Sequence, residues 1–65
     1  MKLFINETLE TLNENEVSIN LIKDRFKKNA DVVILNGYPI SENKLLKDGD
    51  RVTLIKKEKL LHLRS

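Results

Sequence analysis

Apolar and polar residues alternate at the start of this chain, a pattern typical of a β-strand with one buried face. In residues 2–6 the alternation places Leu3 and Ile5 on one face and Phe4 on the other. Residues 8–12 follow after a short polar turn and are again rich in threonine and leucine, so the two segments predict a β-hairpin.

Three segments in the second half of the chain also predict strands. Residues 32–35 form a continuous β-branched and leucine run, which predicts a central strand shielded on both faces or nearly so. Residues 38–40 follow an Asn-Gly turn and can form only a short edge strand, because Pro39 has no amide hydrogen to donate. Residues 51–56 follow an Asp-Gly turn and alternate once more, which predicts the last strand.

One segment between the hairpin and the later strands has helical spacing. Ile19, Ile22 and Phe26 recur at the i, i+3, i+7 interval of a single buried face. Ser18 is a suitable N-cap, and Asn29 is a suitable left-handed residue at which the helix ends. The sequence therefore predicts a helix that begins after Ser18 and ends at residue 28.

The resulting order is β-β-α-β-β-β. A single helix packed on one face of a mixed sheet of four to five strands is an economical core for a chain of this length. The predicted fold class is therefore α+β, of the β-grasp (ubiquitin-like) type.

The composition is that of one small domain with nearly balanced charge. Twelve Lys and Arg stand against ten Asp and Glu, for a net charge of +2, and the chain has no cysteine. The excess is local: residues 51–65 hold five basic residues and one acidic residue, whereas residues 1–50 hold seven and nine. We expect a β-grasp domain over residues 1–57 and a basic tail or linker over residues 58–65.

Several functional classes are excluded or disfavoured by what the sequence lacks. Without cysteine there is no disulfide, thiolate metal site or cysteine nucleophile. The longest apolar run has four residues, far short of a membrane span, so we expect a cytoplasmic protein with no membrane contact. The single histidine, His62, has no partner motif, and the acidic pairs of the sequence lie in predicted turns. We therefore expect no catalytic residue, no metal and no cofactor, and the chain is predicted not to be an enzyme.

Two motifs at a suitable spacing resemble a known family. Residues 33–37, Val-Ile-Leu-Asn-Gly, end one predicted strand, and residues 46–52, Leu-Lys-Asp-Gly-Asp-Arg-Val, open the last one. With the Lys-Leu-Phe-Ile-Asn start, they are similar to the ThiS and MoaD sulfur carriers, which are ubiquitin-like β-grasp proteins. The resemblance covers residues 1 to about 57. It implies a partner that is an ATP-using adenylyltransferase of the ThiF type.

The end of the chain departs from the carrier pattern. The resemblance implies a C-terminal Gly-Gly, whose carboxylate is adenylated and converted to a thiocarboxylate, but no glycine follows Gly49. The sequence resembles more closely the ThiS-like domain at the N-terminus of some ThiF-type adenylyltransferases. That resemblance implies a non-catalytic module of thiamine (thiazole) sulfur transfer, docked on or fused to such an enzyme. The alternatives are a true carrier with an altered or lost tail and a TGS-like RNA-binding β-grasp module; the near-neutral charge disfavours nucleic acid.

A docking surface is predicted on the sheet face away from the helix. If the alternate residues of three strands face the helix, the pleat turns other large apolar side chains outward, where a contiguous patch would mark a protein-interaction site. The alternatives are cover by the leucines of residues 58–65 and simple scattered exposure. The predicted partner-binding residues are the apolar Phe4, Ile34 and Ile55, with Arg51, Lys56 and Lys57 at their rim.

Overall fold

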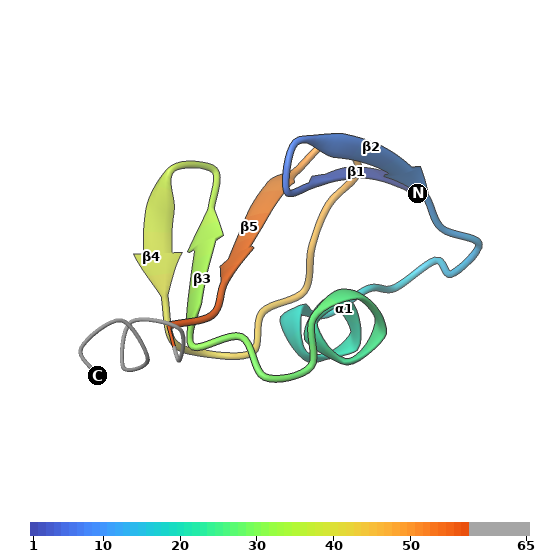
Figure 1. The fold of residues 1–65 in the computed structure, drawn as a ribbon. Coiled ribbons are helices and arrows are strands. Elements are labelled where there is room, and N and C mark those ends of the chain that lie inside the picture. Colours follow the sequence, from blue (N-terminus) through green and yellow to red (C-terminus); the bar gives the residue numbers. More distant parts are fainter. Residues whose placement is uncertain (58–65) are drawn as a thin grey trace, which may run out of the picture.

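The described part of the chain, residues 1–57 of a computed structural model, is a β-grasp domain (Figure 1). One sheet has the strand order β2-β1-β5-β3-β4, in which β1 and β5 are parallel and the other neighbours are antiparallel. The predicted fold class and element order are confirmed. The elements are β1 (Lys2–Ile5), β2 (Thr8–Thr11), α1 (Ile19–Phe26), β3 (Val32–Leu35), β4 (Tyr38–Ile40) and β5 (Arg51–Ile55).

Each of the two hairpins is closed by a turn of two residues. Asn6 and Glu7 join β1 to β2 with φ of 49° and 71°, and Asn36 and Gly37 join β3 to β4 with φ of 51° and 90°. Positive φ at both central positions is the type I′ turn, whose twist matches that of the flanking strands. The turns fix the register, with Ile5 opposite Thr8 in the first hairpin.

The core lies between α1 and one face of the sheet. Buried strand residues alternate with outward-facing ones, and α1 contributes Ile19 and Ile22. Connecting segments complete the cover of the sheet, because Leu12, Val17 and Leu46 are also buried. The buried residues of the described part are all apolar: Leu3, Ile5, Leu12, Val17, Ile19, Ile22, Ala30, Val33, Leu46, Val52 and Leu54.

The first turn of α1 has its free amides satisfied by three different acceptors. Ser18 Oγ accepts from the Leu21 N–H (3.2 Å), as the sequence predicted. The Asn43 Oδ1 atom accepts from the Asn20 N–H (2.9 Å), and the Lys44 carbonyl accepts from the Ile19 N–H (2.9 Å). These amides would otherwise lack partners. The segment that follows β4 is therefore anchored to the start of the helix.

The predicted end of the helix is wrong. The helix ends at Phe26, and Lys27 already has an extended backbone with φ of −156°, whereas Asn29 does not adopt a positive φ. The chain must turn back early because Ala30 is buried and the Asp31 N–H donates to the Ile55 carbonyl (2.7 Å). The helix ends where it does because the chain must return to the sheet.

The prediction for β3 also needs correction. The central strand is β5, which lies between β1 and β3. Only Val33 of β3 is buried, while Ile34 on the opposite face keeps part of its surface in solvent. A four-residue apolar run does not reveal whether one face or both are covered, since the sheet here has a helix on one side only.

An Asp-Gly turn pairs with the start of β1. Asp48 Oδ1 accepts from the Lys2 N–H (2.6 Å), and the Gly49 N–H donates to the Lys2 carbonyl (2.6 Å). Gly49 has φ of 91°, a conformation that glycine adopts without a Cβ clash. The turn therefore extends the contacts of β1 beyond its strand partners.

The Asn-Gly turn is bonded to the beginning of β5. Asn36 Oδ1 accepts from the Arg51 N–H (2.9 Å), and Asn36 Nδ2 donates to Asp50 Oδ1 (3.1 Å). Asp50 Oδ2 accepts in turn from the Lys47 N–H (2.8 Å). The two sequence motifs of the family resemblance thus contact each other directly.

We expect Leu3→Ala to lower the free energy of unfolding by about 2–5 kcal/mol, because the Leu3 side chain is fully buried. Leu45→Ala removes the same atoms at a position that is 62% exposed, and it should change stability by no more than about 0.5 kcal/mol. Urea unfolding of the two variants checks the comparison. Equal losses would contradict the placement of the core.

Substitutions at Asn36 separate its hydrogen bonds from its backbone conformation. Asn36→Gly keeps the positive φ but removes both side-chain bonds, and should cost about 1–2 kcal/mol of stability. Asn36→Ala should cost about 1 kcal/mol more, because alanine is strained at φ of 51°. Equal stability of the two variants would show that backbone strain does not contribute.

Candidate protein-docking surface

The sheet has an outer face, defined here as the face opposite α1. Register places Phe4 beside Arg51 on neighbouring strands, and it places Ile34 beside Thr53. Alternation along β5 carries Arg51, Thr53 and Ile55 to the same face. The predicted residues Phe4, Ile34 and Ile55 therefore share this face.

These three apolar residues do not touch as one cluster. Phe4 and Ile34 are separated by β5, whose outer residues between them are the polar Arg51 and Thr53. The apolar surface instead consists of cross-strand pairs on either side of β5. The pairs are Phe4 with Leu9, Ile34 with Pro39, and Ile55 with Val32, and these six residues are called the outer-face patch below.

The sequence pattern did not predict three members of the outer-face patch: Leu9, Val32 and Pro39. Leu9 is 53% exposed and Ile55 is 37% exposed, so the patch offers large apolar side chains to solvent. The signal for Leu9 was the Asn6–Glu7 turn: a two-residue turn places Leu9 opposite Phe4. Leu9 and Leu12 then fall on opposite faces because they are three residues apart.

Arg51 lies on the patch rather than only at its rim. Its Cζ atom is 4.9 Å from the centroid of the Phe4 ring, within the range of a cation–π contact. Alternation also places Lys2 on the outer face, two residues before Phe4. No strand contributes a carboxylate to this face within residues 1–57, so its strand residues carry only positive charge.

Lys56 and Lys57 lie at the other end of β5 from Arg51. Lys56 comes five positions after Arg51, a span of about 17 Å in extended chain. Lys56 is half-buried, and the Lys57 N–H donates to Asp31 Oδ2 (2.8 Å). The structure thus joins Arg51 to Phe4 and places the two lysines beyond Ile55. The leucines of residues 58–65 and His62 lie outside the described residues.

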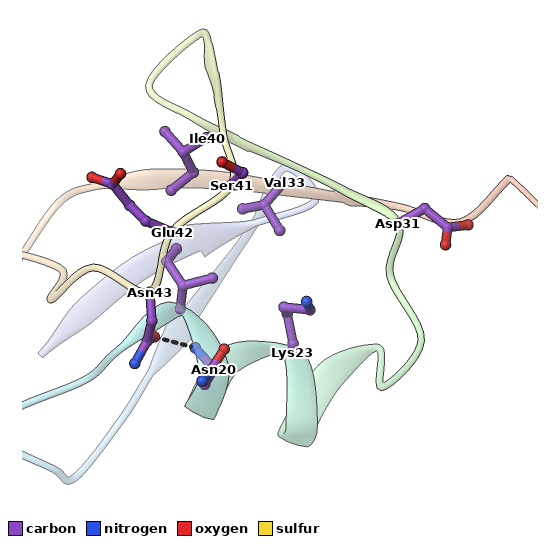
Figure 2. A pocket seen from close by; sticks show the side chains of 9 residues that line it. Asn20, Lys23, Asp31, Val33, Ile40, Ser41, Glu42 and Asn43 are labelled. Carbon is purple, nitrogen blue, oxygen red and sulfur yellow. Dashed lines mark hydrogen bonds between the residues drawn. The ribbon is translucent and has the colours of Figure 1, made fainter.

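A small pocket opens on the helix side of the sheet (Figure 2). Its volume is about 160 Å³, smaller than the roughly 300–1,000 Å³ of typical small-molecule sites. Asn20 and Asn43, which belong to the helix cap, lie on one side of it, and Lys23 lies below the strands. The lining residues are Ile19, Asn20, Lys23, Asp31, Val33, Ile40, Ser41, Glu42 and Asn43.

The ion pair of Arg25 and Glu14 serves local structure. The Arg25 guanidinium binds both carboxylate oxygens of Glu14 (2.6 and 3.2 Å), which ties the loop before α1 to the helix. This hydrogen bonding holds the pKa of Glu14 below its ordinary value and raises the pKa of Arg25. Within residues 1–57, no three His, Cys, Asp or Glu side chains converge as metal ligands, and no helix is long and apolar enough to cross a bilayer.

A β-grasp sheet with one covered face defines a ubiquitin-like module. A family model described as ThiS-like ubiquitin matches residues 1–58, and the chain belongs to this family. Membership indicates a small module of the sulfur-carrier type. No curated protein and no solved structure gives a significant match.

A double-mutant cycle tests the contact between Arg51 and Phe4. Phe4→Leu and Arg51→Gln should show a coupling free energy of about 0.5–1 kcal/mol in unfolding experiments, as expected for a cation–π pair at an exposed site. The control cycle combines Phe4→Leu with Lys57→Gln at the far end of β5. Its coupling should stay below about 0.5 kcal/mol. The same coupling in both cycles would contradict a specific contact.

Proposed function

We propose that this chain is a non-catalytic, ubiquitin-like module of thiamine (thiazole) sulfur transfer. In this proposal it docks on a ThiF-type adenylyltransferase, either as a separate chain or as part of the same polypeptide. The outer-face patch is the docking surface. Family membership supports the general class, and the exposed apolar face is the observation on which the docking proposal rests.

The placement of apolar side chains supports docking through the outer face. Leu9 and Ile55 are exposed, while Phe4 and Ile34 are half-buried, so a partner would remove further apolar surface from water. Each 100 Å² of apolar surface buried contributes about 2.5 kcal/mol before the costs of association. Apolar side chains that lie side by side on a surface mark interaction sites, and the outer-face patch provides three such cross-strand pairs.

Charge on the outer face supports a partner with acidic residues around its contact surface. Lys2 and Arg51 are basic, and the described strands add no carboxylate to that face. Arg51 also contacts the Phe4 ring, and arginine is one of the residue types enriched at the energetic centres of interfaces. Opposite charges would steer the encounter and set its orientation.

The residues after β5 favour a module that is not itself the carrier. The resemblance to the carriers implies a tail that extends through a narrow channel, where a Cβ would collide and glycine fits. Residues 50–65 contain no glycine, and the first residues after β5 are bonded back to the domain, because the Lys57 N–H donates to Asp31 Oδ2. These features support a module that docks on the adenylyltransferase but does not itself carry sulfur.

The test is a binding measurement with the ThiF-type adenylyltransferase of the same organism. We expect the double variant Ile34→Ser, Ile55→Ser to bind at least about tenfold more weakly, because each substitution removes about 1–2 kcal/mol of apolar burial. Leu45→Ser is the matched control, since Leu45 is exposed but belongs to the segment between β4 and β5. Circular dichroism confirms that each variant is folded.

The alternatives give different outcomes. Unchanged affinity of the double variant would refute docking through the outer face. A thiocarboxylate detected by mass spectrometry on the native gene product would make the chain a carrier. RNA binding with a steep salt dependence, and no affinity for the adenylyltransferase, would identify an RNA-binding module.

A further inference from the structure

The two edges of the sheet differ in their capacity to accept another strand. In a hairpin closed by two residues, the flanking residues exchange hydrogen bonds, and every second residue beyond them points its N–H and C=O away from its neighbour. In β4 the outward position is Pro39, between Tyr38 and Ile40. Proline has no N–H, so this short edge offers no donor at its middle position.

The edge formed by β2 is open. Ile5 pairs with Thr8 across the turn, and Leu12 and Met1 exchange hydrogen bonds at the other end (2.8 and 2.9 Å). The intervening alternation leaves the N–H and C=O groups of Leu9 and Thr11 directed outward. Both residues are exposed, and β2 is the last strand on this side of the sheet (Figure 1). An incoming strand would thus find two donors and two acceptors.

Side chains along the β2 edge specify what kind of strand fits. Leu9 stands on the outer face beside Phe4, so a neighbouring residue there should be apolar. Glu10 points to the opposite side, paired with the buried Leu3, and is half-buried. A basic residue beside Glu10 would pair with its carboxylate, since opposite charges on adjacent strands stabilise a sheet.

A second copy of this chain fits the edge less well. The antiparallel register that uses both Leu9 and Thr11 of each copy places Glu10 directly opposite Glu10, and like charges there are destabilising. Residues 3–22 contain four glutamates and no Lys or Arg, so no basic residue of this segment relieves that repulsion. Charge therefore disfavours pairing of β2 with a second copy of itself, but it does not disfavour pairing with a strand that carries basic residues.

We propose that β2 accepts an extended segment of a partner protein, in which apolar and basic residues alternate, as a sixth strand. Main-chain hydrogen bonds to Leu9 and Thr11 hold the segment, its apolar side chains extend the outer-face patch beyond Leu9, and its Lys or Arg pairs with Glu10. The proposal does not depend on the partner being an adenylyltransferase.

The test uses the whole chain and a short, end-capped peptide in which valine and lysine alternate. At a peptide concentration ten times Kd, amide hydrogen exchange of Leu9 and Thr11 should slow about tenfold, because exchange is limited to the unbound fraction. A peptide N-methylated at every residue should not bind, because neither of its edges then has an N–H to donate to the carbonyls of Leu9 and Thr11. A valine–glutamate peptide should bind about five- to tenfold more weakly, and Glu10→Lys should reverse this preference.

Leu9→Pro removes one outward donor without touching a β1–β2 hydrogen bond, and it should weaken binding about two- to tenfold. Leu9→Thr keeps the N–H and is the matched control. If Leu9→Pro does not fold, the N-methylated peptide still decides the question. Three results would overturn the proposal. The first is the absence of binding. The second is a set of NMR chemical-shift changes at Phe4, Ile34 and Ile55 without slower amide exchange at Leu9 and Thr11. The third is slower amide exchange at Leu9 and Thr11 that appears at high protein concentration without peptide.

Discussion

The short length of α1 limits how much of the sheet can be covered in this domain. Eight residues of helix span about 12 Å, whereas five strands at their usual spacing form a sheet about 19 Å wide. The helix therefore cannot cover even one face alone, and Leu12, Val17 and Leu46 from the connecting segments complete the core. Nothing in the described residues remains to cover the second face, which is why apolar side chains stand exposed on it.

The hydrogen bonds between turns explain why the family motifs occur together. Asp48 binds the start of β1, and Asn36 and Asp50 bind each other beside the beginning of β5. Each motif taken alone is a common tight turn. Together they attach β1 and the β3–β4 hairpin to the same end of the central strand, and they set the register of β5. Asn36 also joins the two functions of a turn residue, because it adopts a positive φ and supplies a side-chain acceptor.

The outer face and the β2 edge form one continuous surface, because Leu9 belongs to both. A partner that adds a strand beside Leu9 would also lie next to Phe4 and the Arg51 guanidinium. Docking on the face and strand addition at the edge are therefore compatible in one complex. Strand addition is favoured only at the β2 edge, because Pro39 leaves the β4 edge without a donor at its middle position.

The sequence by itself determined the elements and most of the inner and outer assignment. Period-two alternation placed Leu3 and Phe4 on opposite faces, and Ser18 marked the helix start, because these signals are local. Only the tertiary structure decided that β5 is central, that Arg51 contacts Phe4 and that Leu9 joins the patch, since strand order and register depend on pairings between distant residues. The helix end at Phe26 likewise depends on tertiary contacts, because Ala30 and Asp31 must reach the sheet.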